Sequence, residues 1–391
     1  MGIELRTSLL KHLLPGVALI VLSACGGQPD LEETQSVARE PVPQVAENTS
    51  AEIAWRASST GGNLGAVPFE PVVDGNVIFT ASPKGQIKGF DLDTGKNVFS
   101  QTVRGKLANG VGVNTGSVVA VTQKGEVIAL DRSDGSEKWR HDIEGSISAA
   151  PALNEQMVII RTVSGKVIGL NAVSGKQVWS IERPVASLSV GLDAPGLVAA
   201  EGLVSGFSSG RVVASNVFNG GTFWEKRAFR PGGKNEIERL IDIDASPVMA
   251  GDMILVGAFQ GGMVAYRLRT GEEVWRNDGV STRKALAVSP LFVSVTGPES
   301  EVALISVGTG KTRWKRTQLR GNGLSAPVIT DKSVVVGNLD GDLYFLGLTD
   351  GLINSRFRVG TGPITALLKV EQGVVVYSAG SGKLTMIKGL L

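Results

Sequence analysis

From residue 55 onward the sequence repeats itself with a period of about forty residues. The turn glycines that mark the repeat are spaced by 40, 40, 45, 51, 39 and 41 residues and are Gly95, Gly135, Gly175, Gly220, Gly271, Gly310 and Gly351. Four residues after each glycine come Phe99, Trp139, Trp179, Trp224, Trp275, Trp314 and Ser355. A period of this length, held in register over most of the chain, is typical of stacked repeat architectures.

The segment from 151 to 179 shows what one repeat contains. Apolar runs at 157–160 and 167–170 alternate with the turn glycines Gly165 and Gly175, and Trp179 closes the unit. Glycine supplies the positive φ that hairpin turns need, and Val and Ile suit strands that are buried on both faces. Each repeat predicts four short strands, so eight repeats predict an all-β, eight-bladed β-propeller of four-stranded antiparallel blades.

The two ends of the repeat array predict how the ring closes. The eighth repeat begins near Pro363 and stops at Leu391, short of its fourth strand. Residues 51–56 read as that missing strand, with Trp55 in the expected place. We therefore expect one propeller over 51–391, closed by the N-terminal strand, which removes two open sheet edges.

All six tryptophans occur in the register of the repeat. One large ring per blade is what packing between blades requires. Stacking against a cofactor is the alternative role for these rings, and we favour packing.

The first residues predict a secreted lipoprotein. Arg6 and Lys11 precede a short apolar run, and Leu22-Ser-Ala-Cys25 then resembles a bacterial lipoprotein processing box. The run is too short to cross a bilayer. The resemblance implies a signal peptide over 1–24 and lipid attachment at Cys25, and glycines rather than Asp after the cysteine favour the outer membrane. Residues 25–50 are rich in Pro and acidic residues, which predicts a flexible tether.

Most chemistry that a site could use is missing from the sequence. The single cysteine excludes a disulfide framework, and a net charge of +2 does not point to nucleic acid. His141 stands alone beside Trp139, so we interpret it as a surface residue rather than a base or ligand. Carboxylates such as Asp91 and Asp131 fall in repeat turns, where they cap backbone N–H groups. We predict no catalytic, cofactor-binding or metal-binding residues, and hence no cofactor.

The repeat resembles the quinoprotein type, with its copies Asp340-Gly-Asp-Leu-Tyr344 and Thr94-Gly95-Lys96. Quinoprotein dehydrogenases carry pyrroloquinoline quinone and calcium at the axis of an eight-bladed ring, usually beside adjacent cysteines. This chain has no cysteine pair. A quinone-dependent dehydrogenase remains the alternative function, and a peptide- or glycan-binding propeller is a third.

With its processing box, acidic tether and eight repeats, the whole chain resembles the BamB family, lipoprotein subunits of the outer-membrane β-barrel assembly (BAM) machinery. The resemblance implies a non-enzymatic scaffold on the periplasmic face of the outer membrane. Its implied partners are the POTRA domains of BamA, the wider complex and nascent β-barrel proteins. Two stretches match the segments through which the family contacts BamA, and the implied contact residues are Leu188, Val190, Arg239, Asp242 and Asp244, with Gly191 where the family often has arginine.

The spacing of the repeat points to the same two stretches. The two longest periods place extra residues near 181–196 and 225–243, each after the fourth strand of a blade. Both connections flank the fourth blade, so we expect two adjacent long loops on one face, where binding residues often lie. Neutral growth of surface loops is the alternative explanation.

Overall fold

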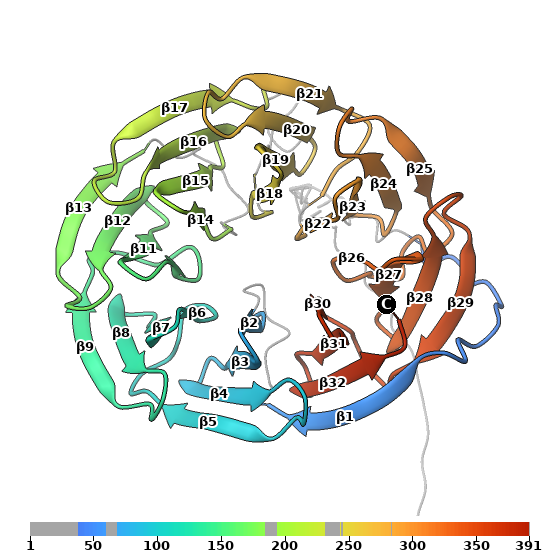
Figure 1. Ribbon diagram of the computed structural model, residues 1–391, viewed down its shortest axis with the longest axis horizontal. Helices are drawn as coiled ribbons and strands as arrows, with labels where there is room; N and C mark the ends of the chain where they lie inside the picture. The colour runs from blue at the N-terminus through green and yellow to red at the C-terminus, as the bar shows by residue number, and fades with distance from the viewer. Residues whose placement is uncertain are drawn as a thin grey trace, which may run out of the picture. The chain divides into compact units, whose positions relative to one another are not determined.

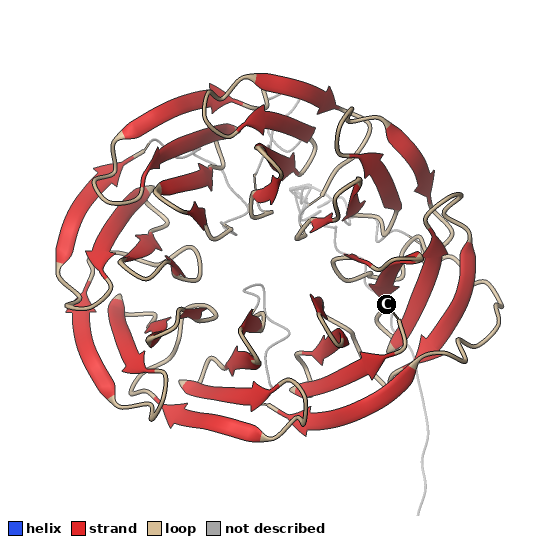
Figure 2. Ribbon diagram, in the orientation of Figure 1, coloured by secondary structure: helices blue, strands red, loops and turns tan. Residues whose placement is uncertain are grey.

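The computed structural model describes residues 38–59, 69–183, 194–230, 243, 245–282 and 284–390. Within these residues, 32 strands form eight four-stranded antiparallel sheets. The sheets stand around a common axis as the blades of a ring (Figure 1), and strands and loops make up all of its described part (Figure 2). The eight-bladed β-propeller predicted from the repeat is confirmed.

Blades 1 to 7 follow one another along the chain, and each runs from an inner first strand to an outer fourth strand. The strands of blades 1 to 4 are β2 (Val72–Asp74), β3 (Val77–Ala81), β4 (Gln86–Asp91) and β5 (Asn97–Thr102); β6 (Gly112–Val113), β7 (Ser117–Val121), β8 (Glu126–Asp131) and β9 (Glu137–Asp142); β10 (Ala152–Leu153), β11 (Met157–Arg161), β12 (Lys166–Asn171) and β13 (Gln177–Glu182); β14 (Leu197–Ala199), β15 (Gly202–Gly206), β16 (Arg211–Asn216) and β17 (Thr222–Arg227). The strands of blades 5 to 7 are β18 (Val248–Ala250), β19 (Met253–Ala258), β20 (Gly262–Arg267) and β21 (Glu273–Asn277); β22 (Ala287–Val288), β23 (Phe292–Thr296), β24 (Val302–Ser306) and β25 (Thr312–Arg316); β26 (Val328–Ile329), β27 (Ser333–Gly337), β28 (Asp342–Gly347) and β29 (Ile353–Arg358).

Blade 8 joins the two ends of the propeller. Its first three strands are β30 (Ala366–Val370), β31 (Gly373–Ser378) and β32 (Lys383–Lys388), and its outer strand is β1 (Glu52–Ser58), which pairs antiparallel with β32. The predicted closure by the strand of Trp55 is confirmed. Ser355 is the only residue at the tryptophan position of the repeat that is not aromatic. It lies in blade 7, next to this seam, where Ala51 and Leu390 enter the buried cluster.

The core lies between blades. Leu255 and Trp275 of blade 5 pack in one buried cluster with Val293 and Ile305 of blade 6. Full burial of a Val, Leu or Ile side chain stabilises the fold by about 1.5–3 kcal/mol. The middle strands supply most of these residues because their side chains are covered by a neighbouring blade on each side.

Each tryptophan links its blade to the next one. The indole Nε1 donates to a carbonyl oxygen in the following blade at 2.7–3.1 Å, in the pairs Trp55–Leu92, Trp139–Ala172, Trp179–Val217, Trp224–Leu268, Trp275–Val307 and Trp314–Leu348. The rings are buried. The interpretation of the tryptophans as packing residues is confirmed.

The ring has two faces with different loops. One face carries the hairpins between the second and third strands of each blade, together with the connections from each fourth strand to the next blade. In blade 1, for example, the N–H of Leu107 in the connection after β5 donates to the carbonyl oxygen of Pro83 in the β3–β4 hairpin at 3.1 Å. We call this the connection face. The other, the turn face, carries the remaining turns, and there Leu92 N–H donates to Asn76 O at 2.9 Å.

Residues 38–50 lie against the propeller, although the composition of 25–50 predicts a flexible tether. Val42 and Val45 pack on the buried cluster that contains Leu319 and Tyr344. Composition does not reveal this contact because few residues of the segment make it.

Candidate partner interface

All predicted partner-binding residues, and the predicted lipid attachment site, lie outside the described residues. They are Leu188, Val190, Arg239, Asp242, Asp244 and Cys25. The ends of the two connections that carry the first five are described, and these ends show how the connections are held.

Both connections border blade 4. The first joins β13 to β14 and the second joins β17 to β18, so blade 4 lies between them in the chain and in the ring (Figure 1). The prediction that the two longest connections flank the fourth blade is confirmed. Their ends belong to the connection face.

The first connection is fixed to blade 4 where it begins. The Arg183 guanidinium donates to the Thr222 hydroxyl at 2.5 Å and lies 3.5 Å from the Glu225 carboxylate. Glu225 also pairs with Arg211 at 2.5 Å, so one carboxylate of β17 serves two arginines. Because these groups are partly exposed, the pairs orient the chain more than they stabilise it.

Arg161, the last residue of β11, fixes the other end of the first connection. Its side chain is only 4% exposed, and it donates to the carbonyl oxygens of Ala194 and Gly206 at 2.8 Å each. Its guanidinium lies 4.8 Å from the centre of the Phe207 ring, a favourable cation–π distance. Blade 3 thus holds the end of the connection against blade 4.

Arg161 is not among the residues predicted from the sequence, although its position in the repeat carries a signal. The residues at the same strand position in the other blades are Ala81, Val121, Gly206, Gly257, Thr296, Gly337 and Tyr377. A lone arginine among uncharged residues at a buried position marks a specific contact, because a buried charge requires partners.

The second connection is fixed by Ile243, which is 2% exposed and packs in a cluster with Phe229 and Ala258. A Cβ on Gly206 would lie 2.3 Å from Ile243 Cγ2, so glycine is required at this contact. Gly206 therefore contacts Ile243 of the second connection, while its carbonyl oxygen accepts from Arg161, which also holds Ala194 of the first connection. The described ends of both connections are thus fixed beside the same strand of blade 4, the first of them through Arg161.

Two other features of the ring were candidates for a site. A cavity of about 870 Å³ lies on the connection face between blades 1 and 2 and is lined by Arg104, Lys106, Lys124, Glu126 and Arg140 among others. The second feature is the pair of Glu70 and Lys284, which lie among many protein atoms although both residues keep exposed surface. Burial raises the pKa of Glu70 and lowers the pKa of Lys284, and the opposite charge of each residue counteracts the shift of the other.

In the described part of the chain, no three His, Cys, Asp or Glu residues come together as metal ligands would. The same residues include no helix that is long and apolar enough to cross a membrane.

Known proteins resemble this chain in amino-acid sequence and in the propeller fold. The sequence model of the family described as outer membrane protein assembly factor BamB matches residues 38–109 and 83–316. A curated relative from Pseudomonas aeruginosa, named "Outer membrane protein assembly factor BamB", is 44% identical over 80% of this chain and 82% of its own length. The crystal structure of BamB from Moraxella catarrhalis is similar in fold, with a TM-score of 0.77 and 24% identity over 86% of this chain and 99% of that chain.

The quinoprotein fold is also found among solved structures. A quinohemoprotein alcohol dehydrogenase from Comamonas testosteroni is similar to 87% of this chain and 76% of its own, with a TM-score of 0.65 and 13% identity. At that identity the likeness concerns the fold alone. The family match and the curated relative together show that this chain belongs to the BamB family of outer membrane protein assembly factors, with a propeller of quinoprotein-like repeats.

Proposed function

We propose that this protein is a non-enzymatic scaffold of the BAM complex that binds the POTRA domains of BamA through the two connections flanking blade 4. Membership of the BamB family supports a role in outer-membrane protein assembly. The observation that carries the finer proposal is that the described ends of both long connections are fixed beside β15 of blade 4, the first through Arg161 and the second through the contact of Ile243 with Gly206. Fixing the ends of two neighbouring loops in this way lowers the cost of ordering them on binding.

Each predicted contact residue has a role in this interface. Leu188 and Val190 provide apolar anchors from the first connection, while Asp242 and Asp244 accept hydrogen bonds or ion pairs from the partner. Arg239 supplies a donor for a partner carboxylate or carbonyl. An interface of this kind places apolar contacts beside a small number of oriented polar ones.

The direct test is co-purification of BamA with the double variant Asp242→Arg, Asp244→Arg. Reversing two partner-facing charges leaves the partner's own charges unpaired, so we expect recovery of BamA to fall by about tenfold or more. Full recovery would contradict the assignment of these residues.

A matched double variant controls for the change in net charge. Glu201→Arg, Asp252→Arg makes the same reversal on the turn face of blades 4 and 5, where Asp252 is exposed at 72% of its side chain. We expect BamA recovery with this variant to equal that of the unchanged protein. An equal loss with both variants would show a general charge effect.

The proposed anchor is a lipid on Cys25, which would hold the protein on the periplasmic face of the outer membrane after removal of 1–24. The variant Cys25→Ser tests it. We expect this variant to fractionate with the soluble periplasm, whereas the unchanged protein stays with the membrane. Mass spectrometry of the purified mature N-terminus should show the lipid mass on the cysteine.

A further inference from the structure

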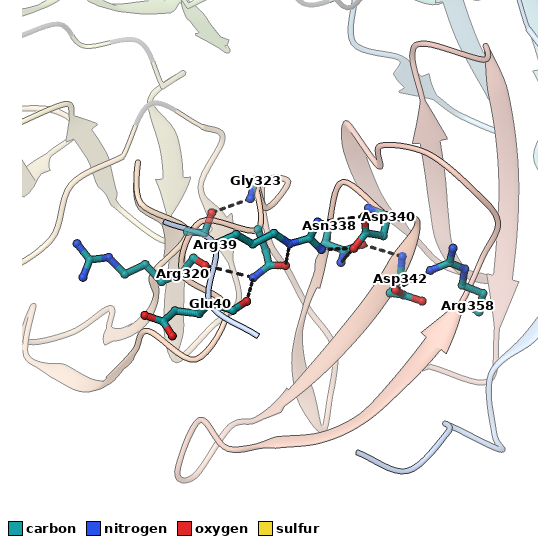
Figure 3. Close-up of polar contacts among 10 residues, drawn as sticks. Arg39, Glu40, Arg320, Gly323, Asn338, Asp340, Asp342 and Arg358 are labelled. Carbon is teal, nitrogen blue, oxygen red and sulfur yellow. Dashed lines mark hydrogen bonds and ion pairs between the residues drawn. The ribbon is translucent and has the colours of Figure 1, made fainter. Parts of the chain in front are cut away.

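Residues 38–48, which we call the strap, form an ordered contact with blades 6 and 7. Arg39 Nε donates to Asn322 Oδ1 at 2.8 Å, and the same guanidinium forms an ion pair with the Asp340 carboxylate. Figure 3 shows the Arg39 side chain extending toward Asn338 and Asp340. The ion pair lowers the pKa of Asp340, chiefly through the hydrogen bond from Arg39.

Asn322 makes this contact more than a surface ion pair. Its side chain is fully buried, at 0% exposure, and its amide nitrogen donates to Glu40 O at 3.1 Å and Arg320 O at 3.2 Å. The Glu40 N–H in turn donates to Arg320 O at 2.9 Å. The strap thus supplies the partner that the buried Asn322 oxygen needs, since a buried polar atom without a partner is costly.

The other end of the strap adds to the outer edge of blade 7. The Arg356 N–H of β29 donates to Ala46 O at 3.0 Å, and the Asn48 N–H donates back to Arg356 O at 2.7 Å. The Glu47 carboxylate pairs with the Arg356 side chain at 2.8 Å. The strap therefore covers an open strand edge, and its own Val42 and Val45, between the two polar ends, pack on the buried cluster of blades 6 and 7.

Two sequence features restrict this contact to blade 7. The hairpin position of Asp340 is held in other blades by Lys84, Lys124, Ser164, Ser209, Gln260, Glu299 and Ser381. Of these only Glu299 is acidic, and it already pairs with Arg320 at 2.7 Å. A Cβ on Gly321 would lie 2.7 Å from Ala38 O and 2.8 Å from Arg39 Cα, so only glycine allows the strap to approach here.

We propose that blades 6 and 7 form a docking site for the strap, and that this site fixes where the N-terminal segment with Cys25 leaves the propeller. Arg320, Asn322 and Asp340 belong to the connection face. The lipid-bearing segment would then start from the same face as the two connections proposed to bind BamA.

Docking also limits how far the propeller can stand from the membrane, a consequence that rests on the proposed lipid at Cys25. Cys25 precedes Arg39 by 14 residues and Ala51 by 26 residues. Extended chain spans at most about 3.3–3.6 Å per residue, so the reach is about 50 Å with the strap docked and about 90 Å with it released.

Hydrogen exchange of the mature full-length protein in detergent tests the docking itself. We expect the amides of Glu40 and Asn48 to exchange slowly, and Arg39→Gln to accelerate the Glu40 amide by about tenfold or more, as loss of a hydrogen bond to a charged group would. The matched control is Arg267→Gln, which removes the ion pair of Arg267 with Asp252 on the turn face of blade 5, from an arginine as exposed as Arg39. If the Glu40 and Asn48 amides of the unchanged protein exchange as fast as those of an unstructured chain, the proposal is overturned.

A second pair of variants tests the docking without touching a charge. Gly321→Asn places a Cβ against the strap, and asparagine tolerates the positive φ of 73° at this position. Gly362→Asn is the control, because Gly362 has a φ of 93° and nothing within 4 Å of its Cβ position. We expect only Gly321→Asn to release the strap. Equal strap exchange in the two variants would count against the site.

The reach is tested by energy transfer from a fluorophore on blade 7 to labelled lipid in bilayers carrying the lipidated protein. We expect Arg39→Gln to lower the transfer efficiency because the released strap lengthens the tether. Unchanged transfer with faster strap exchange would overturn the reach and leave the docking intact. Failure of the unchanged protein to bind bilayers would instead count against the lipid anchor, and the exchange experiment does not depend on it.

Discussion

The indole Nε1 of Trp139 donates a hydrogen bond of 2.8 Å to the carbonyl oxygen of Ala172 in the next blade. The same ring lies over Gly175, where an added Cβ would be 2.5 Å from Cε3. The ring and the glycine therefore form one contact between blades. Because both recur in the sequence, the same contact recurs around the propeller.

Shortening this side chain should separate its two contributions. We expect Trp139→Phe to destabilise the protein by about 1 kcal/mol, since it keeps a ring but loses the hydrogen bond. Trp139→Ala should cost about 3–5 kcal/mol, because it also leaves a cavity between the blades. Urea unfolding followed by circular dichroism measures both, with Val173→Ala at a 75% exposed position as the control. A cost below 1 kcal/mol for the alanine variant would contradict the inter-blade role.

Asp131 should make one turn of blade 2 sensitive to acid. Hydrogen bonds from the Ser133 hydroxyl and N–H, helped by Lys138, lower the pKa of Asp131 to about 2. A folded-state pKa below the unfolded value of 3.8 means that the ionised cap stabilises the fold above about pH 4. This contribution is lost as the pH falls from about 4 toward 2.

The neighbouring blade provides a substitution that tests this pH dependence. Asn171 holds the same turn position and accepts from the Ser174 N–H at 2.9 Å without titrating. We expect Asp131→Asn to keep the cap and to remove the loss of stability between pH 4 and 2, while Asp131→Ala should weaken the turn at every pH. Thermal unfolding measured from pH 7 to 2 distinguishes them. A steeper acid dependence in the asparagine variant would show that Asp131 is not the group responsible.

The fold could be predicted because each repeat carries its own signals. Glycines such as Gly175 and rings such as Trp179 serve contacts that recur every forty residues or so, and recurrence is visible in one sequence. Arg161 acts through the backbone carbonyls of Ala194 and Gly206, 33 and 45 residues away, and carbonyl acceptors leave no mark in a sequence. Arg39 meets Asp340 across 301 residues from a segment whose composition is typical of disorder.

The sequence predicts which loops carry the partner residues, but not how their side chains are arranged. The spacing of Gly175, Gly220 and Gly271 predicts extra residues in the two connections on either side of blade 4, and the structure confirms that these connections are the longest. The side chains of Leu188 and Asp242 fall outside the described residues, so their roles stay predictions. Repeat spacing locates an insertion, whereas the contacts inside it depend on a partner that the sequence does not contain.

The shared quinoprotein fold gives a further prediction about cofactors. Fold likeness does not imply function, because function depends on the residues of a site. We expect no stoichiometric complex when pyrroloquinoline quinone and calcium are added, as measured by absorbance after gel filtration, and no alcohol-dependent dye reduction. A one-to-one complex with the unchanged protein would revive the dehydrogenase alternative.

A substitution of Arg161 tests whether its effect on the free energy of unfolding can be told apart from its effect on partner binding. Arg161→Met fills similar space but leaves the Ala194 and Gly206 carbonyl oxygens without this donor, so we expect a loss of about 3 kcal/mol in unfolding free energy. Because the Ala194 contact holds the end of the first connection, recovery of BamA should also fall at temperatures where circular dichroism shows a folded ring.

Arg211→Met is the matched control, since Arg211 lies in blade 4 but pairs with Glu225 at a partly exposed site. We expect it to change stability by less than about 1 kcal/mol and to leave BamA recovery intact. If Arg161→Met lowers stability yet recovers BamA in full, Arg161 supports the ring alone and the end of the first connection does not depend on it for binding. If both arginine variants lose BamA equally, the loss reflects reduced positive charge near blade 4 rather than the position of the connection.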